Sequence, residues 1–131
     1  MRGLTMLGCC GLLLLAGCGG GDGKACKVEG RVYYRGSPVP GGTIVFSPDP
    51  ERGGHGPLAM GVIGADGRYT LHTGAEAGAV PGWHRVTIAP AAIENQRLVQ
   101  SLPERYADPQ RSGKCCEVKA GQLNVIEINL E

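Results

Sequence analysis

Short segments in which apolar and polar residues alternate recur along the chain from residue 27 onward. In the first of them, Val28 and Val32 fall on one face and Glu29 and Arg31 on the other. A period of two residues is typical of a strand that buries one face. We expect seven short strands, separated by turns rich in glycine and proline, at residues 28–35, 43–47, 58–64, 68–73, 83–88, 115–119 and 124–130.

Seven strands without a convincing helix predict a seven-stranded antiparallel β-sandwich, in which two sheets pack face to face. Ala65-Asp66-Gly67 predicts a tight hairpin turn, because Asp and Gly tolerate the positive φ that such turns require. The exception to the strand pattern is the segment 91–113. We expect it to be a packed crossover with one helical turn within 93–102, and an interaction loop is the alternative.

The N-terminal pattern is different, because an apolar run extends from Leu4 to Leu15 behind the single basic residue Arg2. The run ends at Leu15-Ala16-Gly17-Cys18 and is followed by glycines. A basic start, an apolar stretch and small residues before a cleavage point are the parts of a secretory signal. The run is shorter than the roughly 20 apolar residues that a transmembrane helix needs. Residues 1–17 are therefore expected to serve targeting, not folding.

The sequence Leu15-Ala16-Gly17-Cys18 resembles the lipobox of bacterial lipoproteins. The resemblance implies cleavage between Gly17 and Cys18 and acylation of Cys18, with palmitate-type chains that hold the protein at a membrane. Two or three acyl chains make such attachment effectively permanent. Residues 18–26 then form a lipidated, glycine-rich tether. The resemblance further implies an exported protein at the periplasmic face, outer membrane or cell surface, and Gly19 after the cysteine mildly favours the outer membrane.

The mature chain is close to electrically neutral. Removing 17 of 131 residues leaves 114, enough for one domain, which we place at residues 27–131. The full chain has 13 basic and 12 acidic residues, and loss of Arg2 with the signal leaves 12 of each. Neutrality without a run of like charge argues against nucleic acid as a partner.

Three cysteines remain after the signal and the lipid site are set aside: Cys26, Cys115 and Cys116. An exported compartment permits disulfides. Alternation places Cys116 on the face of Val118, so a bridge between Cys26 and Cys116 is expected if their strands are neighbours. Three free thiols are the alternative, because a bridge needs Cα atoms within about 7 Å.

Several turn and strand motifs together resemble the carboxypeptidase regulatory-like, or transthyretin-like, domain. They are Gly30-Arg31-Val32, the turn 36–42, the segment 65–71, and Pro81-Gly82 followed by Val86-Thr87-Ile88; the segment 102–109 resembles a lipoprotein subfamily of that domain. The resemblance covers residues 27–130 and implies a prealbumin-like sandwich without established catalytic activity. This chain departs from the family at His84, which occupies a position where an inward aromatic is usual. Either a histidine is buried there or the strand shifts by one residue.

Few residues suggest chemistry. The spacing of His55, His72 and His84 matches no zinc motif, and no nucleophile or phosphate-loop motif occurs, so no catalytic residue, metal or cofactor is expected. Trp83 and Tyr106, with a further tyrosine at position 33, could form an exposed aromatic surface for sugars, although aromatic residues make up only 5% of the chain and more often pack in cores.

The sequence thus favours a non-enzymatic, lipid-anchored β-sandwich that acts as a structural or adhesion-type binding module at the cell envelope. The alternative is a carbohydrate- or peptide-binding accessory domain that uses an exposed edge or the segment 91–113. The partners implied are a membrane, reached through the N-terminal acyl chains, and an unidentified protein or glycan.

Overall fold

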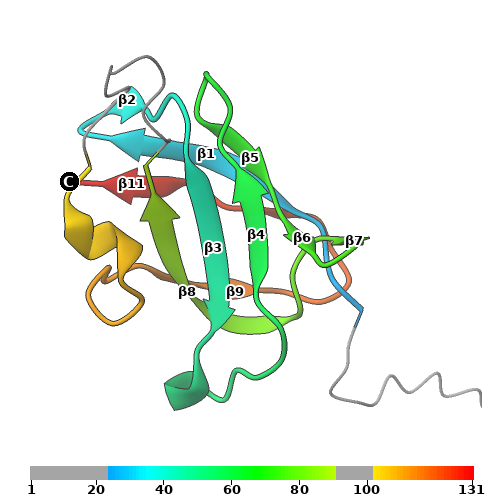
Figure 1. Ribbon diagram of the computed structural model, residues 1–131. Helices are drawn as coiled ribbons and strands as arrows, with labels where there is room; N and C mark the ends of the chain where they lie inside the picture. Colours follow the sequence, from blue (N-terminus) through cyan, green and yellow to red (C-terminus); the bar gives the residue numbers. More distant parts are fainter. Residues whose placement is uncertain (1–23, 91–101) are drawn as a thin grey trace, which may run out of the picture.

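The computed structural model describes residues 24–90 and 102–131, and these residues form an all-β domain of two sheets (Figure 1). The five-stranded sheet contains β1 (Val28–Tyr34), β2 (Ser37–Pro38), β5 (Arg68–Thr70), β10 (Asn124–Val125) and β11 (Ile128–Leu130). The six-stranded sheet contains β7 (Glu76–Ala77), β6 (His72–Thr73), β4 (Ala59–Val62), β3 (Thr43–Pro48), β8 (Gly82–Ala89) and β9 (Cys115–Val118), in that spatial order. The prediction of an all-β fold with two sheets is confirmed.

The strand β1 is the centre of the five-stranded sheet. It pairs antiparallel with β5 and β2, and parallel with β10 and β11. The predicted antiparallel arrangement therefore holds for the other pairs but not for β10 and β11. No hairpin joins either of them to β1. The chain passes through the six-stranded sheet before it returns to β1, so a tight turn does not fix the relative direction of these strands.

Two of the predicted strands are divided. The segment 68–73 changes sheets at the buried residue Leu71, because β5 pairs with β1 whereas β6 pairs with β4. The segment 124–130 likewise splits into β10 and β11. The turn at 65–67 forms as expected, with Gly67 at a φ of 84° and Asp66 accepting a hydrogen bond from the Arg68 amide at 3.1 Å. It joins strands of different sheets, however, and so turns a corner of the sandwich.

A single hydrophobic core lies between the sheets. The rings of Phe46 on β3 and Tyr69 on β5 are 6.3 Å apart, centroid to centroid, which places a contact from each sheet at the centre. Buried apolar residues from both sheets surround this pair; among them are Val28, Val32, Ile44, Leu71, Val86, Ile88, Val118 and Ile128. Their alternation along the strands matches the faces that the sequence predicts.

Two single-turn 3-10 helices complete the described structure: η1 (Pro50–Arg52) follows β3, and η2 (Glu104–Ala107) packs against β8. Residues 91–101, which include most of the expected helical turn at 93–102, lie outside the described residues. The turn that the structure shows comes a little later, at η2. It is tied to the end of β11 by the Tyr106 hydroxyl, which donates a hydrogen bond to the Glu131 carbonyl at 2.9 Å. The second half of the segment 91–113 is therefore packed against the sandwich, as the crossover interpretation expects.

Candidate functional site

The expected lipidation and cleavage residues, Gly17 and Cys18, lie outside the described residues. In the part of the chain that is described, no helix is both long and apolar enough to span a membrane.

The expected aromatic surface is not formed. Tyr106 is buried in the core. Its hydroxyl is hydrogen-bonded to the main chain of Glu131, and its ring lies under the Arg105 guanidinium. Trp83 is half-buried on the outer face of β8, where the Arg52 guanidinium stacks on its ring at 4.8 Å. The structure therefore does not bring Trp83 and Tyr106 together as an exposed surface, and sequence alternation could not show that η2 is folded against the sandwich.

Cys26, Cys115 and Cys116 are free thiols in the structure, so the expected bridge between Cys26 and Cys116 is not formed. The two residues do not lie on neighbouring strands. The main chain of Cys26 forms an isolated antiparallel β-bridge with Ala79, whereas the main chain of Cys116 on β9 pairs with His84 on β8. Burial raises the pKa of the Cys116 thiol to about 12, and the adjacent Cys115 acts in the same direction. Cys116 is thus a poor nucleophile.

His84 is fully buried in the core, so the first of the two alternatives at this position, a buried histidine, is the one that the structure shows. Its ring packs against Phe46 at 5.8 Å, and its Nε2 lies 2.8 Å from the Val80 carbonyl, so the Nε2–H tautomer donates there. Nδ1 is buried and has no hydrogen-bond partner among the residues that the structure describes. Burial lowers the pKa of His84, against the opposing effect of the Val80 carbonyl. These contacts make His84 a neutral core residue.

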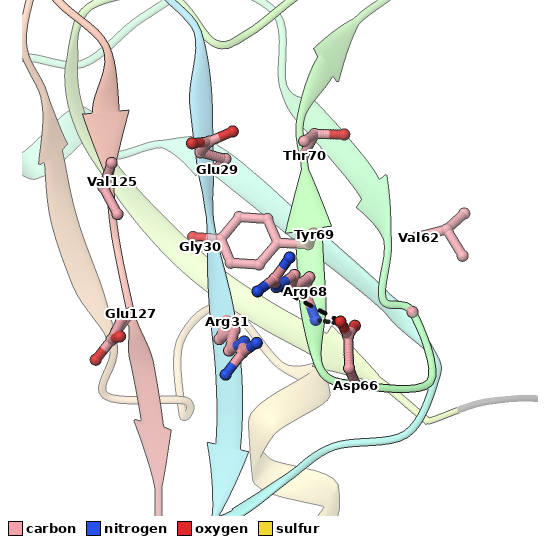
Figure 2. Close-up of a pocket in the computed structure, with 11 residues that line it drawn as sticks. Glu29, Gly30, Arg31, Val62, Asp66, Arg68, Tyr69, Thr70, Val125 and Glu127 are labelled. Carbon is pink, nitrogen blue, oxygen red and sulfur yellow. Dashed lines mark hydrogen bonds and ion pairs between the residues drawn. The ribbon is translucent and has the colours of Figure 1, made fainter.

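A groove of about 670 Å³ lies on the outer face of the five-stranded sheet (Figure 2). It is the face that points away from the core, so it is built from the polar half of each alternating strand. Its side chains come from β1, β5, β10 and the turns beside them, and they include Glu29, Arg31, Arg68, Thr70, Val125 and Glu127.

Charges of both signs line the groove. Arg31 on β1 lies directly opposite Arg68 on β5, an arrangement in which like charges repel. Arg68 is compensated by Asp66 at 3.5 Å. Tyr33 holds the pKa of the Arg31 guanidinium above its usual range, and the carboxylates of Asp66 and Glu127 act in the same direction. Figure 2 shows Arg31 between Glu127 and Asp66 in this row.

Two exposed valines flank the charged row. Val62 on β4 is 78% exposed and Val125 on β10 is 65% exposed, and both line the groove. An exposed apolar side chain contributes favourable free energy to binding when a partner removes its surface from water. The groove thus combines apolar contacts at its sides with charged groups between them.

The floor of the groove is closed by a close contact below Gly30. The Tyr69 hydroxyl donates to the Ile126 carbonyl at 2.6 Å, across the space that a side chain at residue 30 would fill. A Cβ on Gly30 would clash with that carbonyl oxygen. This contact separates the groove from the core.

Among the described residues, no group of three or more His, Cys, Asp or Glu side chains could hold a metal ion. None of the groove residues was among the expected site residues, although most of them are the polar members of the alternating strands whose apolar members predicted the core.

Comparisons of the chain with family models, with curated proteins and with solved structures found no match.

Proposed function

We propose that this chain is an exported, lipid-anchored protein whose carboxypeptidase regulatory-like β-sandwich acts as a non-enzymatic, adhesion-type binding module at the cell envelope. The groove on the five-stranded sheet is its contact surface, and an extended peptide segment of a partner protein is its ligand. The observation that carries the proposal is the groove itself, with charged groups of both signs between two exposed valines.

A peptide suits this surface better than a sugar. Carbohydrate sites commonly use an exposed aromatic ring as a stacking platform, whereas the aromatic ring in this groove, Tyr69, is buried in the floor. An extended peptide carries alternating side chains that can place apolar groups on Val62 and Val125 and charged groups on the row between them. Its main chain can also accept hydrogen bonds from Arg31 and Arg68.

The groove is tested with a peptide array and a glycan array, both probed with the fragment 19–131. This fragment contains the whole described core, which extends from Val28 to Leu130. We expect binding to peptides that combine apolar and charged residues. Val125→Ser and Glu127→Gln should each weaken that binding, while Leu58→Ser, at an exposed apolar position outside the groove, should leave it unchanged. Silence on both arrays, binding to glycans alone, or equal losses in Val125→Ser and Leu58→Ser would contradict the proposal.

The anchor has a separate test, based on labelled fatty acid added to bacteria that express the full chain. Cys18→Ala should abolish incorporation of the label and release or mislocalise the protein. Cys10→Ala is the matched control, because this neighbouring cysteine leaves with the signal and should not change labelling. Label that persists in Cys18→Ala would overturn the anchor.

A further inference from the structure

A second pocket lies on the opposite sheet, between η1, the outer face of β8 and the segment 109–115, and it has a different character from the groove. Its volume is about 520 Å³ and most of its lining is polar; the charged members are Asp49, Glu51, Arg52, Arg85 and Lys114. A pocket lined in this way does not suit an apolar ligand, because the polar groups would lose their contacts with water.

Two of the cations are held in fixed positions. The Nη2 atom of Arg85 lies 3.1 Å from Asp49 and 3.2 Å from Glu51, and the Asp49 side chain that orients it is only 4% exposed. Arg52 stacks on Trp83 and reaches Asp49 at 3.8 Å. Both guanidinium groups are thus oriented before any ligand arrives, which reduces the entropy lost on binding.

The fixed arginines have donors to spare. A guanidinium has five N–H donors in a planar fork, and Arg85 uses the same nitrogen, Nη2, for both of its carboxylates. Among the residues that the structure describes, Lys114 makes no ion pair although it lines the same pocket. Three cations against two carboxylates leave the lining with one net positive charge.

We propose that this pocket binds a compact oxyanion, a phosphate or phosphate ester, with Lys114 and Arg85 as its main donors. Charge-assisted hydrogen bonds from arginine and lysine are the usual means of holding such groups. This site is separate from the peptide groove and does not depend on it. The anion can come from solution or from the headgroup of an anionic lipid, and the chemistry of the pocket is the same for both.

The test uses the full chain, purified in a neutral detergent, and measures phosphate affinity by calorimetry at constant ionic strength. A second arm adds phosphatidylglycerol to the micelles and follows the melting temperature. We expect Lys114→Gln to weaken binding about tenfold, the loss of one charge-assisted contact. Lys119→Gln is the matched control, because Lys119 is an exposed lysine that directly follows β9 and lies outside the pocket. The phosphate affinity of this variant should equal that of the parent protein.

A response to phosphate assigns a soluble ligand, and a response to phosphatidylglycerol alone assigns a lipid headgroup. Arg85→Gln should also lose binding, but it removes the partner of the buried Asp49 carboxylate and so can unfold the domain. If Arg85→Gln does not fold, Lys114→Gln still tests the proposal. No response in either arm, or equal losses in Lys114→Gln and Lys119→Gln, would overturn the site.

Discussion

The Tyr69 hydroxyl and the Ile126 carbonyl are joined by a 2.6 Å hydrogen bond that crosses the central strand β1 below Gly30. Tyr69 projects from β5 on one side of β1, and Ile126 lies between β10 and β11 on the other side. Burial raises the pKa of the Tyr69 hydroxyl, which therefore stays protonated and remains a donor. The bond links the two flanks of the five-stranded sheet at a point where Gly30 leaves the space for it.

Tyr69→Phe should destabilise the domain, because it leaves the partly buried Ile126 carbonyl without its partner. We expect a loss of about 1–2 kcal/mol in the free energy of unfolding, measured by urea denaturation. Tyr34→Phe is the matched control, since the described structure gives the Tyr34 hydroxyl no hydrogen bond. Equal stability of Tyr69→Phe and the parent protein would show that this bond does not hold the sheet together.

The alternation of the strands was enough to predict the sheets and their buried faces. Each predicted segment contains a strand, and the parity that places His84 with Val86 and Ile88 is correct, but two segments are divided and the short strands β2 and β7 were not predicted. The sheet change at Leu71 and the parallel pairing of β10 and β11 could not be predicted in this way. Both depend on which strand a segment meets in space, and a period of two residues carries no information on that choice.

The sites were harder to predict than the fold. Tyr106 was named as a possible member of an exposed aromatic surface from its residue type alone, and its hydrogen bond to Glu131 joins residues 25 positions apart. The pocket at Asp49 and Arg85 likewise joins a loop to the outer face of a strand, and neither residue belongs to a sequence motif. Such contacts follow from the packed arrangement, whereas a local turn signal such as Asp66-Gly67 predicted its turn correctly, although not which sheets the turn joins.

The three thiols should differ sharply in reactivity. Cys115 is exposed, Cys26 is half-buried with its Sγ 3.6 Å from the Lys24 carbonyl, and burial raises the pKa of Cys116 from 9.0 to about 12. Three units of pKa lower the thiolate fraction of Cys116 about a thousandfold. Timed alkylation with iodoacetamide, followed by peptide fragmentation in a mass spectrometer, should find Cys115 modified first and Cys116 last.

The control for this experiment is the same alkylation in guanidinium chloride without reductant. Unfolding should bring Cys26 and Cys116 to the rate of Cys115, because their protection comes from burial. If Cys26 and Cys116 stay unmodified in the unfolded chain while Cys115 reacts, the two are joined by a bridge and the free-thiol arrangement is contradicted.

Asp49 should be far more important for stability than Asp66, although each side chain accepts a hydrogen bond from the main-chain amide two residues later. The donor is Glu51 for Asp49 and Arg68 for Asp66. Asp49 is 3% exposed and pairs with Arg85, whereas the Asp66 side chain is 57% exposed in its pair with Arg68. Asp49→Asn leaves Arg85 without its buried partner and should cost about 2–3 kcal/mol. Asp66→Asn should cost less than about 0.5 kcal/mol. Urea denaturation of both variants checks the difference, and similar losses would contradict it.

The buried, neutral His84 should make the domain sensitive to mild acid. Burial holds the pKa of His84 below its ordinary value of 6.5, so the unfolded chain takes up a proton before the folded one as the pH falls. The contribution of His84 to stability is therefore complete above about pH 6.5 and is lost as the pH falls below it, with a slope of up to about 1.4 kcal/mol per pH unit. The cross-strand neighbour Cys116 does not titrate in this range, since its pKa is about 12.

Urea denaturation between about pH 7.5 and pH 5 measures the slope, and this window stays above the ordinary pKa values of carboxylates. His84→Phe should flatten the slope even if it changes the stability at neutral pH, whereas His72→Phe, on an exposed position of β6, should leave it as in the parent protein. A slope that survives in His84→Phe would assign the acid sensitivity to other groups.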